Sequence, residues 1–267
     1  MSLPQMRPQD GVAWITGASS GIGAAVAREM ARRGWTVAVT ARRLDLLENL
    51  AREAEGLPGR IVAHAADVSQ PDAMRAVVET IENVHGPIAV AFLNAGVAPQ
   101  TDATALIDVA ALERALAVNT IGVARGLAAI AERMRQRRRG QIVVNASAAG
   151  YAGLPGAGVY GASKAAIIYL CESLKFGCDA QGIRLQLLSL GFVDTPMTRA
   201  KTFAKPLMLG AEEAARRIVD GFERGGFEIS VPRRIAWSLK LARMLPYSAY
   251  FRLLGRAARR CIPRRED

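Results

Sequence analysis

The sequence has few cysteines and histidines, and their positions exclude several kinds of site. Cys171, Cys178 and Cys261 have neither zinc-binding nor C-x-x-C spacing, so we interpret them as reduced thiols and expect no metal site. His64 and His85 lie near no serine or cysteine in a nucleophile motif. Because the chain has no other histidine, a Ser-His-Asp hydrolase is nearly excluded.

Long apolar runs are also missing. The longest, IAVAFL and LQLLSLGFV, are far shorter than the roughly 20 residues that a transmembrane helix needs, so we expect none. Only ten residues precede the first strand-like run, GVAWITGAS, which leaves no room for a signal peptide. These absences predict a cytoplasmic protein.

Positive charge is concentrated at the C-terminal end. The formal net charge is +11, and residues 232–267 hold ten basic and two acidic residues, a net charge of +8. The rest of the chain is therefore close to neutral. Since no basic field covers it, nucleic-acid binding is not expected.

Short apolar, β-branched segments alternate with longer alanine-rich amphipathic segments. We expect strands at 11–16, 35–41, 60–66, 88–94, 140–146, 183–190 and 227–231. We expect helices near 21–33, 43–55, 71–84, 106–137, 159–180 and 211–223. This alternation predicts an α/β fold with a doubly wound parallel (Rossmann-like) sheet, formed by a single domain at 1–231 that binds ligands at the carboxyl ends of its strands. A basic C-terminal extension, 232–267, follows it.

The first expected strand ends in TGASSGIG, where Gly17, Gly21 and Gly23 lead into a helix. Glycine lets the backbone turn tightly and approach a pyrophosphate, and the helix N-terminus offers free N–H groups. The spacing is a variant of the dinucleotide-binding fingerprint. Such a turn can also serve helix–strand packing alone, but its place after the first strand favours cofactor binding.

The second expected strand ends in VTARR. An NAD site usually carries an acidic residue here for the ribose hydroxyls, whereas an NADP site uses arginine for the 2′-phosphate. Ala41 supplies no carboxylate, and Arg42 and Arg43 follow it. A solvated arginine pair is the alternative, but the position and the missing acid favour NADP.

Tyr160 and Lys164 lie four residues apart in YGASK, with Ser147 thirteen residues before the tyrosine. Residues four apart share one face of a helix. A tyrosine with an ordinary pKa near ~10 is poorly suited to base chemistry at neutral pH, and a neighbouring cation favours its phenolate. The pair therefore indicates acid–base chemistry, with a packed helical tyrosine as the alternative.

Together these segments resemble the short-chain dehydrogenase/reductase family over residues 11 to about 231. The shared motifs occur in the family's order: TGASSGIG, DV, NAG, VNTIG, Ser147, YGASK and GFVDTP. The resemblance implies an NADP(H)-dependent oxidoreductase that interconverts a carbonyl and a secondary alcohol, with Tyr160 as general acid or base. The catalytic residues that it implies are Asn119, Ser147, Tyr160 and Lys164. The cofactor-binding residues that it implies are Gly17, Ser19, Ser20, Gly21, Ile22, Gly23, Arg42, Arg43, Asp67, Val68, Asn94, Ala95, Gly96, Tyr160, Lys164, Val193 and Thr195.

The resemblance also implies roles. Lys164 would hydrogen-bond the nicotinamide ribose, Ser147 would donate to the substrate oxygen, and Asn119 would hold a water that connects Lys164 to solvent. The chain departs from the family at Leu190-Gly191, where Pro-Gly is usual. The lost proline frees a φ angle and adds a backbone donor, so cofactor positioning at this turn is the least secure expectation.

The C-terminal extension carries two apolar stripes between basic residues, Trp237, Leu241, Met244 and Leu245, then Tyr250, Leu253, Leu254 and Ala257. An apolar face with a basic opposite face is typical of a peripheral helix on an anionic membrane. A pair of helices over the substrate opening, or against a subunit partner, is the equal alternative. Similar apolar C-terminal helices in related lipid-ketone reductases hint at a lipophilic substrate.

Other functions stay open at this stage. The enzyme alternative is an NAD-dependent dehydrogenase of a sugar or other small polar alcohol, and the other class is a catalytically silent NADP-binding sensor or scaffold. The substrate cannot be read, because the segments that vary most in the family, 97–105, 148–158 and 196–210, surround its site. Helices 106–137 and 159–180 match those that pair between subunits in the family, so a homodimer or homotetramer is expected.

Overall fold

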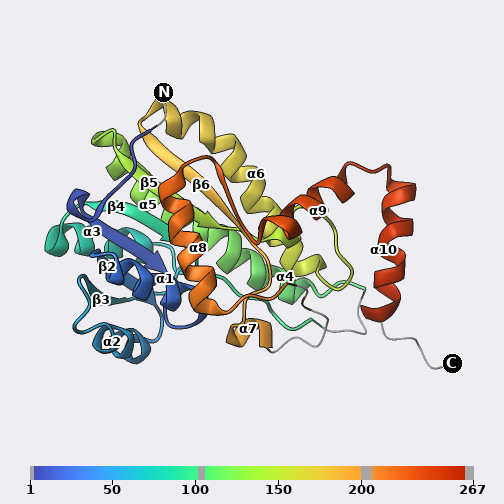
Figure 1. Cartoon of the computed structure of the whole chain (residues 1–267), viewed down its shortest axis with the longest axis horizontal. Helices are drawn as coiled ribbons and strands as arrows, with labels where there is room; N and C mark the ends of the chain where they lie inside the picture. The colour runs from blue at the N-terminus through green and yellow to red at the C-terminus, as the bar shows by residue number, and fades with distance from the viewer. Residues whose placement is uncertain (1–2, 102–105, 200–204, 206, 262–267) are drawn as a thin grey trace.

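Seven parallel strands form a single sheet in the order β3-β2-β1-β4-β5-β6-β7 (Figure 1). The structure, a computed structural model, describes residues 3–101, 106–199, 205 and 207–261. The strands are β1 (Val12–Thr16), β2 (Thr36–Ala41), β3 (Arg60–Ala65), β4 (Ile88–Leu93), β5 (Gly140–Asn145), β6 (Ile183–Leu190) and β7 (Glu228–Val231). Every predicted strand is confirmed to within one residue at each end.

Helices cover both faces of the sheet. Before the last strand they are η1 (Pro8–Asp10), α1 (Gly21–Arg32), α2 (Leu44–Glu53), α3 (Ala73–His85), α4 (Val109–Leu116), η2 (Ala117–Gly122), α5 (Val123–Gln136), η3 (Ala148–Gly150), α6 (Gly158–Ala180), α7 (Pro196–Arg199) and α8 (Ala211–Arg224). Buried residues of β1 alternate between two apolar clusters, with Ala13 and Ile15 facing α1, α2 and α8, and Val12 and Trp14 facing α3, α5 and α6. The predicted doubly wound parallel sheet is confirmed.

The long helix expected at 106–137 differs in two details. It begins at Val109, because the Asp108 carboxylate accepts a hydrogen bond from the Ala111 N–H at 2.8 Å and caps the helix. It also contains a π-helical turn, η2, between α4 and α5. The helical stretch expected near 106–137 is therefore confirmed over most of its length, with a later start and a π-helical turn inside it.

The combined helix 109–136 is long and apolar enough, by length and composition alone, to cross a membrane. Residues along one side of it, including Ala111, Ala115, Leu127, Ile130 and Met134, are buried in the domain, and most of these pack on the sheet. These contacts identify it as a core helix.

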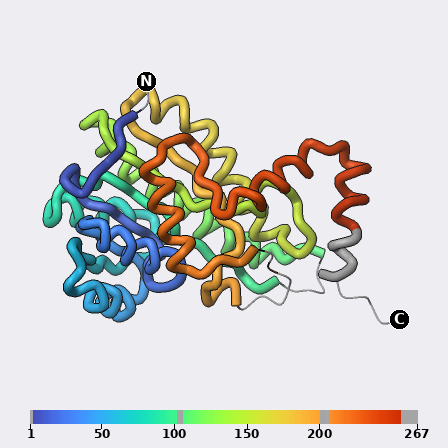
Figure 2. The backbone as a smooth tube through the Cα atoms, viewed as in Figure 1, coloured from blue at the N-terminus to red at the C-terminus, as the bar shows by residue number. Residues whose placement is uncertain are grey.

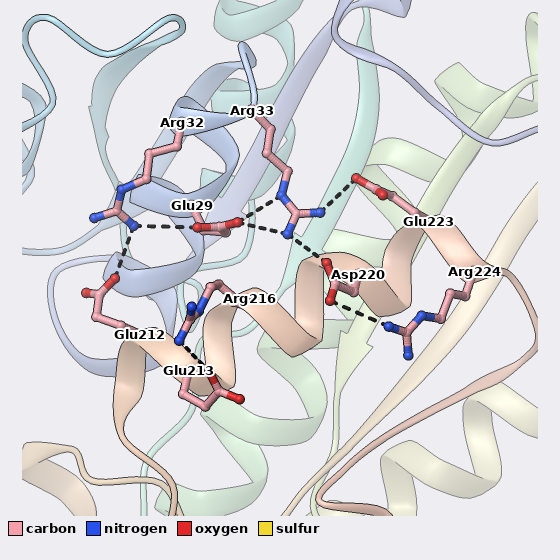
Figure 3. Close-up of polar contacts among 9 residues, drawn as sticks. All are labelled: Glu29, Arg32, Arg33, Glu212, Glu213, Arg216, Asp220, Glu223 and Arg224. Atoms are coloured by element: carbon pink, nitrogen blue, oxygen red, sulfur yellow. Dashed lines mark hydrogen bonds and ion pairs between the residues drawn. The ribbon is translucent and has the colours of Figure 1, made fainter.

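An ion-pair network joins α1 to α8 (Figure 3). Arg33, at the end of α1, pairs with Glu29 at 2.8 Å, Asp220 at 2.7 Å and Glu223 at 2.9 Å. Burial alone would lower the pKa of Arg33. Its three acidic partners outweigh this effect and hold the pKa above its usual range. The network holds α8 beside the helix that follows the glycine-rich turn.

The chain continues after β7 through α9 (Arg233–Arg243) and α10 (Tyr247–Cys261), which project from one side of the domain (Figures 1 and 2). Tyr250 and Leu253 of the expected second stripe lie three residues apart in α10 and so on the same side of the helix, where Tyr250 is buried and Leu253 is 56% exposed. The side chain of Ala257 lies outside the described residues. The division at residues 231 and 232 stays a prediction.

Two of the three cysteines have described side chains. Cys171 is a buried free thiol and Cys178 a partly buried one. Among the residues that the structure describes, no group of three or more His, Cys, Asp or Glu side chains could hold a metal ion.

Candidate active site and cofactor cleft

A cleft at the carboxyl ends of the strands brings almost all the predicted site residues together. It is lined by every predicted catalytic and cofactor-binding residue except Asn119. The lining comes from the turns after six strands, β1, β2, β3, β4, β5 and β6, together with residues of α1, η2, α6 and α7. This is the edge at which doubly wound sheets bind their ligands.

The glycine-rich turn needs glycine for its backbone angles and its close packing, and it leads into a helix start that faces the cleft. Gly17 and Gly21 have left-handed φ angles of 69° and 59°, which favour glycine. A Cβ on Gly17 would lie 2.6 Å from Ala95 Cα, and one on Gly23 would lie 2.4 Å from the Gly17 carbonyl oxygen. Ser20 precedes α1 without a side-chain cap. The first N–H groups of α1 therefore keep their capacity to bind an anion.

Asn94 fixes this turn against the neighbouring strands. Its Nδ2 donates to the carbonyl oxygens of Thr16 at 3.0 Å and Gly17 at 3.2 Å. Its Oδ1 accepts from Asn145 Nδ2 at 2.8 Å. The predicted NAG motif thus holds the floor of the cleft through its asparagine.

Asn145 also lines the cleft, and the sequence reasoning did not predict it. Its carbonyl oxygen accepts a 2.7 Å hydrogen bond from Lys164 Nζ, and its side chain reaches Asn94. Its Oδ1 is buried without a hydrogen-bond partner among the described residues. The available signal was its place at the end of β5, beside β4, the strand that directly precedes Asn94.

The two arginines lie at the end of β2, on the rim of the cleft. Arg43 Nη2 donates to Ser19 Oγ at 2.9 Å, which ties it to the glycine-rich turn. Arg42 is 74% exposed, and its Nη1 lies 4.0 Å from Asp67 Oδ2. Burial raises the pKa of Asp67, but hydrogen bonds from Ser69 and the charge of Arg42 lower it below its usual value. The rim is therefore mainly cationic, with one carboxylate.

Ser147, Tyr160 and Lys164 meet at the inner end of the cleft. All three side chains line the cleft, and the Ser147 hydroxyl interacts with that of Tyr160. Lys164 is 2% exposed, and its Nζ lies 5.9 Å from the centre of the Tyr160 ring. Burial raises the pKa of Tyr160, which the Ser147 hydroxyl partly offsets, and burial lowers the pKa of Lys164 to about 8.

The pKa of Lys164 predicts a pH-dependent stability. Between pH 8 and its ordinary value of 10.5, the unfolded chain binds more protons at this lysine than the folded chain, so stability rises with pH. The unfolding free energy of the wild type, relative to Lys164→Met, should increase by about 2 kcal/mol between pH 7 and pH 9.5. Urea titrations of the cofactor-free proteins measure this change. Lys175→Met, at the surface of the same helix, is the control, and a pH-independent difference for Lys164→Met would contradict the shifted pKa.

Asn119 lies behind the cleft. In the π-helical turn, its Oδ1 accepts from the Val97 N–H at 2.7 Å, and its Nδ2 donates to the Val97 carbonyl oxygen and to Ser163 Oγ, both at 2.9 Å. A Cβ on Gly96 would lie 3.3 Å from Asn119 Oδ1 and 3.5 Å from Lys164 Nζ. Asn119 thus positions the segments on either side of Lys164. Its water-holding role stays a prediction.

Leu190, which replaces the usual proline, continues β6. It pairs with Val231 of β7 and packs against the core, and its carbonyl oxygen accepts a 3.4 Å hydrogen bond from Ser147 Oγ. Strand pairing therefore restrains this position without a proline ring. Val193 pairs with Leu209, and Thr195 faces Gly21 across the cleft. Residues 102–105, 200–204 and 206 of the expected substrate segments lie outside the described residues.

The doubly wound sheet and the glycine-rich turn over its cleft define the nucleotide-binding proteins of the Rossmann type. The model of the short chain dehydrogenase family matches residues 11–205. The chain belongs to this family and is an oxidoreductase of Rossmann fold with a nucleotide-binding cleft.

Relatives and solved structures agree with this membership. The chain is 33% identical, over 88% of its length and 92% of the relative, to an uncharacterized oxidoreductase of Myxococcus xanthus (strain DK1622). It is 33% identical, over 72% of its length and 78% of the relative, to the 3-oxoacyl-[acyl-carrier-protein] reductase of Thermotoga maritima. A short chain dehydrogenase/reductase from Burkholderia phymatum in complex with NAD matches with a TM-score of 0.79 and 25% identity, over 89% of this chain and 94% of that one. A short-chain dehydrogenase from Sphingobium yanoikuyae in complex with NADPH matches with a TM-score of 0.74 and 28% identity, over 96% of this chain and 98% of that one.

Proposed function

We propose that the protein is an NADP(H)-dependent oxidoreductase that interconverts a carbonyl and a secondary alcohol on a lipophilic substrate. The observation that carries the proposal is the meeting of Ser147, Tyr160 and Lys164 in the cleft that also contains the glycine-rich turn. The residues present fit a dinucleotide. The uncapped start of α1 suits its pyrophosphate, and the buried Asn145 Oδ1, which has no partner among the described residues, leaves an acceptor on the cleft wall.

The bound dinucleotide would donate or accept the hydride. In the reducing direction, the proton of the Tyr160 hydroxyl passes to the substrate oxygen as negative charge develops there. The raised pKa of Tyr160 keeps this proton in place at neutral pH. Ser147 donates a hydrogen bond to the same oxygen, and the Lys164 cation, present below about pH 8, stabilises the phenolate that remains.

The choice of NADP is supported by the rim at the end of β2. Arg42 and Arg43 offer cationic donors where an NAD site has a carboxylate, and the 74% exposure of Arg42 leaves its guanidinium accessible. Structural neighbours contain NAD in one case and NADPH in another, so they favour neither. The alternative is an NAD-dependent dehydrogenase of a small polar alcohol.

A lipophilic substrate is supported by an apolar side chain at the cleft. Met197 lines the cleft and is 42% exposed. An accessible thioether adapts to varied apolar surfaces. The relative from Thermotoga maritima is named for a 3-oxoacyl substrate, which also contains an apolar chain.

A screen of ketones and alcohols of graded chain length tests the proposal. With NADPH, we expect kcat/KM to rise with chain length by about three- to fourfold per methylene that the site buries. Activity with NADH on sugars or short polar alcohols would support the alternative instead. NADPH binding without turnover on any substrate would favour the silent sensor or scaffold.

The protein is also proposed to form a homodimer or homotetramer and to be cytoplasmic. Large apolar side chains are exposed along α6 and η2, including Phe176 at 80%, Tyr169 at 77% and Ile121 at 48%. Exposed apolar side chains on neighbouring helices are typical of a subunit interface. Light scattering measures the solution mass.

A further inference from the structure

The helices α9 and α10 form a C-terminal hairpin with an unusual charge composition. No aspartate or glutamate occurs between Glu228 and Glu266. The hairpin is therefore cationic along its whole length, unlike the rest of the chain. Figures 1 and 2 show it projecting beside the segment that precedes α6, away from the sheet.

The inner side of the hairpin is fastened to the segment that follows Ser147. Glu228 accepts hydrogen bonds from Tyr151 at 2.6 Å and Ser230 at 2.9 Å and pairs with Lys240, whose Nζ also lies 4.6 Å from the Tyr151 ring centre. The buried Tyr250 donates a 2.8 Å hydrogen bond to the Gly153 carbonyl oxygen. The hairpin thus has a fixed place beside the catalytic serine.

Six large apolar side chains of the hairpin are exposed instead of packed on the domain. The exposed fractions are 54% for Trp237, 60% for Leu241, 80% for Met244, 61% for Tyr247, 63% for Phe251 and 56% for Leu253. Tyr247 stacks on Phe251 with ring centres 5.7 Å apart, and the Arg243 guanidinium lies 5.3 Å from the Tyr247 ring centre. Arg233, Arg234, Arg243 and Arg252 are exposed as well. We call the exposed apolar side chains of the hairpin its outer face, namely Trp237, Leu241, Met244, Tyr247, Phe251 and Leu253.

The composition of the outer face argues for one kind of partner. Large apolar and aromatic side chains surrounded by arginines, with no acidic residue, match a surface that is apolar beneath an anionic layer. Contact between two such hairpins would bring like charges together, which disfavours a second copy. A lid over the substrate opening would use the inner side, which is already bonded to Tyr151 and Gly153.

We propose that the outer face of the hairpin binds the surface of an anionic lipid bilayer. Trp237, Met244 and Phe251 would enter the acyl boundary, while Arg243 and Arg252 pair with headgroup phosphates. Binding itself does not depend on the proposed chemistry. If both proposals hold, the segment after Ser147 lies beside the membrane that contains the lipophilic substrate.

The test uses the full-length protein and vesicles of phosphatidylcholine, with or without phosphatidylserine. Two of the three tryptophans, Trp14 and Trp35, are 0% and 5% exposed, so a vesicle-induced fluorescence change reports on Trp237. We expect a blue shift and co-sedimentation with the anionic vesicles only. Both should weaken in high salt, because surface charge is screened.

Substitutions assign the binding to the outer face. Met244→Ser with Phe251→Ser should lower vesicle partitioning at least tenfold, and Arg243→Gln with Arg252→Gln should lower it on the order of 20-fold in low salt. Val84→Ser, which alters an exposed apolar residue on α3 (65%) away from the hairpin and from the proposed subunit interface, is the control and should change nothing. Unchanged NADPH binding verifies that each variant is folded.

Three results would overturn the proposal: no partitioning of the wild type, equal partitioning onto neutral vesicles, or equal loss in Val84→Ser. A solution mass that falls by half in Met244→Ser with Phe251→Ser would identify a second copy as the partner instead. These variants are preferable to deleting residues 233–267. The deletion would also remove the ion pair between Lys240 and Glu228 and the hydrogen bond from Tyr250 to the Gly153 carbonyl oxygen.

Discussion

Tyr160→Phe should remove nearly all turnover while leaving the Kd for NADPH within a few-fold of the wild type. The change deletes the proton donor but keeps the aromatic ring, so the walls of the cleft are preserved. Loss of a positioned general acid lowers kcat by about 10²- to 10⁴-fold. Since the lost interaction acts in the transition state, kcat and kcat/KM should fall together.

Steady-state kinetics on the best substrate of the ketone screen, with NADPH binding by fluorescence, measures both quantities. Tyr169→Phe is the matched control, because Tyr169 lies on the same helix but is 77% exposed and outside the cleft. Substantial turnover by a folded Tyr160→Phe protein would refute the catalytic assignment. A large loss of NADPH binding would mean instead that the hydroxyl supports the cofactor site.

The strands and most of the cleft could be predicted because both depend on local signals. Parallel strands buried on two faces appear as short continuous apolar runs, and β1 does so from Val12 to Thr16, all of it buried. The glycine-rich turn must follow such a strand to face the cleft. Its backbone angles at Gly17 and Gly21 then require glycine, which is visible in the sequence.

The contacts that were missed join residues far apart in the chain. Asn145 was not predicted because its importance comes from Lys164 and Asn94, which no local pattern links to it. The bond from Tyr151 to Glu228 spans 77 positions. The inward direction of Tyr250 likewise depends on the Gly153 carbonyl oxygen, which the helical periodicity of the tail does not indicate.

Replacing Arg42 by aspartate should change the cofactor preference towards NAD. The guanidinium lies on the cleft rim 4.0 Å from Asp67, so a 2′-phosphate bound there would meet a cation, whereas in Arg42→Asp it would meet two carboxylates. Loss of one charge-assisted hydrogen bond costs about 1.5–3 kcal/mol, or roughly a 10- to 150-fold fall in kcat/KM for NADPH. The new carboxylate can accept hydrogen bonds from the ribose hydroxyls of NADH, so the ratio should change further.

The ratio of kcat/KM for NADPH to that for NADH, measured at low and moderate salt, reports this change. Arg52→Asp on α2 is the control for charge, because it makes the same substitution outside the cleft. Screened long-range attraction would affect both variants alike, whereas a direct phosphate contact affects only Arg42→Asp. An unchanged ratio would show that Arg42 does not recognise the phosphate. Arg43 would then be the residue to replace, since its bond to Ser19 already holds it against the glycine-rich turn.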